Sequence, residues 1–136
     1  MARIIYAEDD ELVGEIVRDT LMDEGHAVGV IGDGITALKV AKLKVPDLII
    51  LDCSMPGMGG VEVVRRIRNH HELFATPVLM LTGRSSAADE RIALEAGATE
   101  YLKKPFDPDE LVVIVEHMLD DVQKRKETQK LPMRSF

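Results

Sequence analysis

The 136-residue sequence has a single cysteine, no excess of positive charge and no long hydrophobic run. The lone cysteine, Cys53, cannot form an internal disulfide, which fits a reducing cytoplasm. A formal net charge of −7 argues against nucleic acid as the main partner, because such binding relies on Lys and Arg to neutralise phosphates. No apolar run approaches the ~20 residues that span a bilayer. The N-terminus leads directly into a strand-like segment, with no signal peptide. We therefore expect a cytoplasmic protein without direct DNA binding or membrane insertion.

Short apolar segments alternate with segments of helical spacing along the chain. Strands are predicted over 3–7, 27–31, 47–52, 77–82 and 99–103. Helices are predicted over 11–24, around 38–41, around 61–67, over 86–96 and from 107 onward. Five such βα units indicate an α/β fold, a doubly wound parallel sheet with helices on both faces.

Polar side chains follow four of the predicted strands at the point where each strand ends. They are Glu8, Asp9 and Asp10 after the first strand, Asp52 after the third, Thr82 at the end of the fourth and Lys104 after the fifth. Because parallel strands end at the same edge of a sheet, we expect these side chains to gather there. Adjacent carboxylates repel one another unless protons or a cation compensate their charge. Oxygen ligands at an edge open to water suit Mg²⁺.

A carboxylate, a divalent cation, a lysine and a hydroxyl together indicate a site for phosphoryl transfer. This reaction needs mainly positioning and charge neutralisation. Asp52 can then act as the acceptor and carry the phosphoryl group covalently. Taken alone, Asp52 could equally cap the loop that follows it.

Simpler roles stay open for other residues at this edge. Asp10 can cap the helix that follows it. Thr82 can cap the next helix, although Ser85 and Ser86 suit that role at least as well. Lys104 can be an ordinary surface lysine.

At these positions the sequence resembles the receiver domain of two-component response regulators, of the stand-alone chemotaxis-regulator type. The matching motifs are Ile4–Asp10, Leu51–Gly57, Leu81–Gly83, Glu95–Tyr101 and Lys104–Phe106. The resemblance runs from residue 3 to about residue 119. It implies a flavodoxin-like five-stranded sheet in the order 2-1-3-4-5 and a receiver domain over residues 1–122.

The resemblance also implies a role for each residue at the strand ends. Asp52 is the phosphoacceptor. The Mg²⁺ ligands are Asp9 directly, Glu8 through water, Asp52 and the backbone carbonyl of Ser54.

The same resemblance implies how the switch responds. Lys104 contacts the phosphoryl group, Thr82 reports its presence, and Tyr101 turns inward as the threonine hydroxyl moves. The donor is a sensor histidine kinase or a histidine phosphotransfer protein. An output protein binds the face formed by the fourth helix, the fifth strand and the last helix.

Two rival functions conflict with particular residues. An aspartyl-phosphate hydrolase needs a second Asp two positions after the acceptor, where this chain has Ser54. A flavin carrier needs a phosphate cradle after the first strand, where Glu8, Asp9 and Asp10 would repel a phosphate. The sequence therefore favours a switch over a turnover enzyme. A phosphate sink without an output partner and a receiver fragment of a larger regulator remain open.

The C-terminal stretch over residues 123–136 is basic. Its first part is expected to extend the last helix, because cations suit a helix C-terminus. The remainder of this tail is expected to be disordered.

Overall fold

The computed structural model describes residues 1–83 and 86–130. Its five strands are β1 (Arg3–Ala7), β2 (Ala27–Ile31), β3 (Leu48–Leu51), β4 (Val78–Thr82) and β5 (Glu100–Lys103). All strand pairs are parallel, and their order is β2-β1-β3-β4-β5. The predicted flavodoxin-like sheet is therefore confirmed, with β3, β4 and β5 slightly shorter than expected.

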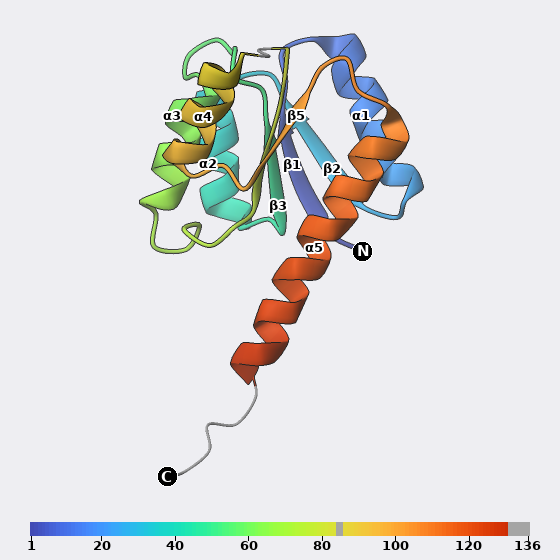
Figure 1. Cartoon of the computed structure of the whole chain (residues 1–136), viewed down its shortest axis with the longest axis vertical. Helices are drawn as coiled ribbons and strands as arrows, with labels where there is room; N and C mark the ends of the chain where they lie inside the picture. Colours follow the sequence, from blue (N-terminus) through green and yellow to red (C-terminus); the bar gives the residue numbers. More distant parts are fainter. Residues whose placement is uncertain (84–85, 131–136) are drawn as a thin grey trace.

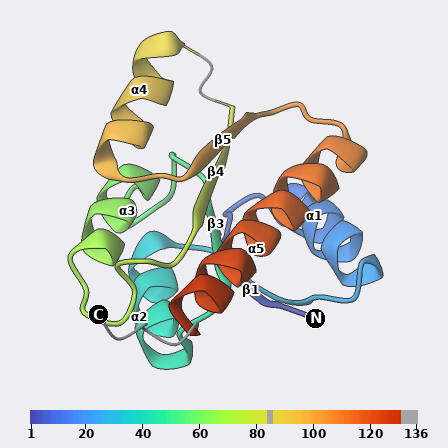
Figure 2. The same cartoon turned by 60° about the horizontal axis from the view of Figure 1, so that its bottom comes forward.

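Helices cover both faces of this sheet, as predicted. They are α1 (Glu11–Asp23), α2 (Gly34–Lys44), α3 (Gly60–Arg68), α4 (Ala87–Ala96) and α5 (Pro108–Lys130). In Figures 1 and 2, α2, α3 and α4 lie on one side of the strands, and α1 and α5 lie on the other. Alternate side chains of each strand enter one of two cores. Ile49 and Leu51 pack toward α2, α3 and α4, whereas Leu48 and Ile50 pack toward α1 and α5.

The strand register brings the polar strand ends together. Ala7 pairs with Leu51 across β1 and β3, so Glu8 and Asp52, the next residue of each chain segment, leave the sheet side by side. On the other side of β3, a backbone hydrogen bond joins the ends of β4 and β5. In it the Lys104 N–H donates to the Thr82 carbonyl at 2.9 Å.

Two polar residues near the strand ends act as helix caps and so have a structural role. The Asp10 carboxylate accepts the N–H groups of Leu12 and Val13, so Asp10 caps α1. The Ser86 hydroxyl accepts the N–H of Asp89 and caps α4, whereas Ser85 lies outside the described residues. Thr82 is therefore not the cap of α4.

The last helix continues into the basic C-terminal stretch. It reaches Lys130 and projects well beyond the sheet (Figure 1). Ion pairs at i,i+4 spacing, Asp120 with Lys124 and Asp121 with Arg125, support this part of the helix. Over 123–130 the basic stretch is thus helical, while the disorder expected for the remaining residues falls on 131–136, outside the described part of the chain. The boundary of the receiver domain at residue 122 stays a prediction. None of the helices within the described ranges is long and apolar enough to cross a membrane.

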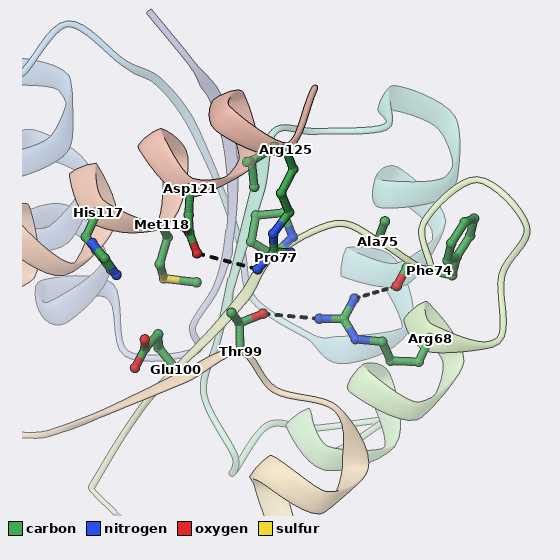
Figure 3. Close-up of a pocket in the computed structure, with 11 residues that line it drawn as sticks. Arg68, Phe74, Ala75, Pro77, Thr99, Glu100, His117, Met118, Asp121 and Arg125 are labelled. Carbon is green, nitrogen blue, oxygen red and sulfur yellow. Dashed lines mark hydrogen bonds and ion pairs between the residues drawn. The ribbon is translucent and has the colours of Figure 1, made fainter. Parts of the chain in front are cut away.

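At the edge opposite the polar strand ends, Arg68 binds three separate segments together (Figure 3). Its guanidinium donates to the carbonyls of Gly97 at 2.8 Å, Thr76 at 2.6 Å and Phe74 at 3.1 Å, and to the hydroxyl of Thr99 at 3.3 Å. The side chain borders a cavity of about 240 Å³ between α5 and the loop before β4. Burial lowers the pKa of Arg68. These contacts give Arg68 a structural role at the end of α3.

Arg68→Ala is expected to lower the free energy of unfolding by about 2 kcal/mol, because several backbone carbonyls lose a charged donor. Arg68→Lys should recover only part of this loss, since an ammonium cannot match the planar fork of donors. Denaturant unfolding measures both values. The matched control is Arg65→Ala, which removes a more exposed arginine of the same helix. Equal stability of Arg68→Ala and Arg65→Ala would contradict this role.

Candidate functional site

Three carboxylates meet at the carboxyl edge of the sheet. Glu8, Asp9 and Asp52 each offer an oxygen, and these oxygens lie within 4.8 Å of one another. Glu8 and Asp52 are buried, with 3% and 7% of their surface exposed, whereas Asp9 is exposed. The expected gathering of these three residues is therefore present. Asp10 serves as the cap of α1 instead.

Lys104 bridges two of these carboxylates. Its ammonium lies 3.1 Å from Oδ2 of Asp52 and also donates a hydrogen bond to Oε1 of Glu8. The side chain is largely buried, and the peptide bond between Lys104 and Pro105 is cis. The two contacts place the ammonium beside Asp52, where charge would increase if that carboxylate received a phosphoryl group.

The loop after β3 holds Asp52 from its other side. The Ser54 N–H donates to Oδ1 of Asp52 at 3.2 Å, and the Gly60 N–H donates to the Cys53 carbonyl at 3.0 Å. A Cβ atom on Gly60 would lie 2.1 Å from the Asp52 carbonyl oxygen, so only glycine permits this close approach of α3. The loop and the helix together fix the orientation of Asp52.

The charges of the site depend on burial and on these contacts. Burial opposes ionisation of Asp52, but the Ser54 N–H and the Lys104 ammonium together outweigh it, so the pKa of Asp52 lies below its usual range. Burial also raises the pKa of Glu8, against the effect of Lys104. Burial opposes the charge of Lys104, yet the two carboxylates raise its pKa above the usual range. At neutral pH Asp52 is therefore ionised and Lys104 is protonated.

Thr82 lies farther along the same edge, whereas Tyr101 lies within β5 and pairs with Met80 of β4. Thr82 is 1% exposed at the end of β4. Tyr101 is half-buried on β5 and packs against the core below α2, α3 and α4. Their roles as switch residues, like the carbonyl role of Ser54, stay predictions.

Tyr6 contacts the site in a way that sequence reasoning missed. Its hydroxyl donates to Oε1 of Glu8 at 2.7 Å. The period of two along a strand could have indicated this contact, because it places residues 6 and 8 on the same face of β1.

The three carboxylates fit a magnesium ion. All their donor atoms are oxygens, and the exposed Asp9 opens the cluster to water. Mg²⁺ prefers one or two carboxylates and keeps several of its waters. A softer metal that needs nitrogen or sulfur ligands would be poorly served by these three residues.

Comparison with known proteins identifies relatives of this chain. The model of the response regulator receiver domain family matches residues 4–116. The DNA-binding response regulator MtrA of Mycobacterium tuberculosis is 40% identical over 113 residues, which cover 83% of this chain and 48% of MtrA. The response regulator protein PmrA of Pseudomonas aeruginosa is 42% identical over 109 residues, 80% of this chain and 48% of PmrA. The chain thus spans about half the length of these curated relatives.

Two solved structures show the same fold. A putative response regulator from Chloroflexus aurantiacus superposes with a TM-score of 0.84 at 34% identity, covering 88% of this chain and 98% of the other. The chemotaxis response regulator CheY4 of Vibrio cholerae superposes with a TM-score of 0.82 at 35% identity, covering 87% and 98% of the two chains.

Proposed function

Because this chain belongs to the response regulator receiver domain family, we propose that it is a phosphorylation switch whose acceptor is Asp52. Receiver domains of response regulators are signalling switches, and the family binds Mg²⁺ in its acidic pocket. The observation that carries the proposal is the contact of Lys104 with both Asp52 and Glu8, beside Asp9. A structural ion pair alone would not require a third carboxylate at the same point.

The chemistry follows from the groups at this edge. An ionised oxygen of Asp52 attacks the phosphorus of a phosphohistidine on a sensor histidine kinase or a phosphotransfer protein. The phosphorus–nitrogen bond breaks, and the histidine nitrogen takes up a proton. Lys104 neutralises charge beside the acceptor. Glu8, Asp9, Asp52 and the Ser54 carbonyl would hold Mg²⁺, which supplies further charge neutralisation when bound.

Phosphorylation by a small donor such as acetyl phosphate is expected to require Mg²⁺. Without the cation, the carboxylates repel the anionic donor. Intact-mass spectrometry should show one added phosphoryl group with Mg²⁺ and none in excess chelator, and peptide mapping should locate it on Asp52. Phosphorylation that persists in the chelator, or that maps to another residue, would refute the proposal.

The surface formed by α4, β5 and α5 is proposed to bind the output protein. Thr82 leads into the segment before α4, Tyr101 lies on β5, and Lys104 leads into α5. A phosphoryl group at Asp52 would attract the Thr82 hydroxyl and the Lys104 ammonium. This attraction would shift the balance between two packings of this surface. Both helices expose apolar side chains that suit a protein partner: Leu94 of α4 and Val113 of α5 are 42% and 66% exposed.

Amide exchange is expected to change on this surface when a phosphoryl mimic binds Asp52. The bias need only be ~1–3 kcal/mol to alter partner affinity by roughly 5- to 150-fold. Mass spectrometry of the free and mimic-bound protein measures the exchange, with Asp52→Asn as the control that cannot take the mimic. Changes confined to α1 and α2 would place the output surface elsewhere.

The length of the curated relatives favours a second candidate, in which this chain is the receiver part of a larger regulator. It covers 48% of the DNA-binding response regulator MtrA, so further output could be covalently attached. A phosphate sink would share the chemistry at Asp52 but have no output partner. Pull-down with and without the phosphoryl mimic distinguishes the sink from the switch. A cytoplasmic location, in reach of a sensor kinase, completes the proposal.

A further inference from the structure

A tyrosine hydroxyl reaches the acceptor edge from inside the domain. Tyr6 is fully buried in the core between the sheet, α1 and α5. Its ring lies on the same face of β1 as the side chain of Glu8, two residues later, and its hydroxyl lies 2.7 Å from Oε1 of that residue. A buried phenol needs a partner for its O–H group, and here the partner is a candidate ligand of the cation.

The contact continues through the site as a chain of hydrogen bonds. Oε1 of Glu8 accepts from the Tyr6 hydroxyl and from the Lys104 ammonium, and the same ammonium lies 3.1 Å from Oδ2 of Asp52. The second oxygen, Oε2 of Glu8, accepts the N–H of Asp10 at 3.3 Å. The two oxygens of Glu8 therefore have different surroundings, and the stronger donors are both on Oε1.

The hydroxyl of Tyr6 is the donor in its contact with Glu8, because an ionised carboxylate has no proton to donate. The direction of the hydrogen bond therefore follows from the chemistry of the two groups.

We propose that Tyr6 is a positioning residue for the cation site, because its hydroxyl holds Oε1 of Glu8 against Lys104 and leaves Oε2 for the cation or its bound water. This inference rests on the proposed function, since it assumes that Glu8 serves a bound Mg²⁺. The length of the glutamate side chain is part of the arrangement. An aspartate at position 8 would be one methylene shorter and would draw the carboxylate away from the phenol.

Removal of the hydroxyl should leave the core packed but the carboxylate free to turn. Tyr6→Phe keeps the buried ring and deletes one oxygen. Lys104 then becomes the dominant partner of Glu8, so the carboxylate is drawn toward the ammonium and offers less negative charge to a cation. Loss of an outer hydrogen bond to a metal ligand typically lowers metal affinity by ~10- to 100-fold. We expect the lower end of this range, about 10-fold.

Titration calorimetry with Mg²⁺ on four proteins tests the inference: wild type, Tyr6→Phe, Glu8→Asp and the double variant. The expected result is weaker binding on Tyr6→Phe in the Glu8 background and little further change in the Glu8→Asp background. An equal loss in both backgrounds would show a general packing effect and overturn the inference. Equal affinity of wild type and Tyr6→Phe would overturn it as well. Absence of Mg²⁺ binding by the wild type would instead refute the proposed function itself.

A spectroscopic measurement keeps the inference testable should Tyr6→Phe not fold. The chain has two tyrosines and no tryptophan, so in Tyr101→Phe the near-UV absorbance reports on Tyr6. Mg²⁺ should shift this absorbance, because the cation changes the charge on the carboxylate that Tyr6 contacts. The calorimetric affinity of this variant shows in parallel that the cation is bound. A bound cation with no spectral shift would overturn the proposed link between Tyr6 and the site.

Discussion

Asp52→Asn is expected to abolish phosphorylation by acetyl phosphate and by a histidine kinase. The side-chain amide is a poor nucleophile and cannot form the acyl phosphate, whereas the native carboxylate is held ionised by the Ser54 N–H and Lys104. Mg²⁺-dependent incorporation of a phosphoryl group, followed by intact mass, should fall to the level of the chelator control.

The fold of Asp52→Asn should survive, so that the loss can be assigned to chemistry. The substitution preserves the size of the side chain, and Lys104 keeps Glu8 as a partner. We expect a change in the free energy of unfolding of about 1 kcal/mol or less. A suitable comparison is Asp47→Asn, which changes an aspartate directly before β3, at the far end of the same strand. Phosphorylation of Asp52→Asn at the wild-type level would exclude Asp52 as the acceptor.

The sheet and the gathering of polar strand ends could be predicted because they depend on local patterns. The all-apolar β3 marks the centre of a parallel sheet, and β4 is apolar up to Thr82 at its end. Parallel strand ends share one edge, so the sequence predicts that Glu8, Asp52 and Lys104 lie together. The family motifs added the expected roles of these residues.

The contacts inside the site could not be predicted in the same way. Lys104 has several single bonds, so sequence spacing does not determine that its ammonium lies between Glu8 and Asp52. The hydrogen bond from Tyr6 depends on the ring direction within the core. The contacts of Arg68 depend on the path of two loops, which no periodic pattern describes.

The length of α5 was only partly predictable. No proline or glycine interrupts the sequence between Pro108 and Lys130, and oppositely charged residues recur at i,i+4 spacing near its end. These signals favour a helix. The basic composition of the same stretch was also compatible with a disordered tail, since charge alone does not distinguish the two states.

Lys104→Ala and Thr82→Ala are expected to have different phenotypes. Lys104 contacts Asp52 and Glu8 directly, so its loss leaves two close carboxylates without their shared cation. Lys104→Ala should therefore slow phosphorylation and also weaken the response of the α4, β5 and α5 surface. Thr82→Ala removes a buried hydroxyl at the end of β4 but no charge at the acceptor. It should be phosphorylated at close to the wild-type rate and respond only weakly.

Each variant has a matched control. Lys103→Ala removes the neighbouring lysine, which is more exposed and lies 4.0 Å from Glu90. Thr82→Ser keeps the hydroxyl and deletes a methyl group, so it should restore much of the response lost in Thr82→Ala. The rate of phosphorylation by acetyl phosphate measures how well Asp52 accepts the phosphoryl group. Amide exchange with the phosphoryl mimic measures how far the α4, β5 and α5 surface responds. If Lys104→Ala and Thr82→Ala both matched wild type in rate and in exchange, the charge of Lys104 and the hydroxyl of Thr82 would have no part in the switch. If Thr82→Ala instead lost phosphorylation, the threonine would act at the acceptor, and acceptance and response would not be divided between these two residues.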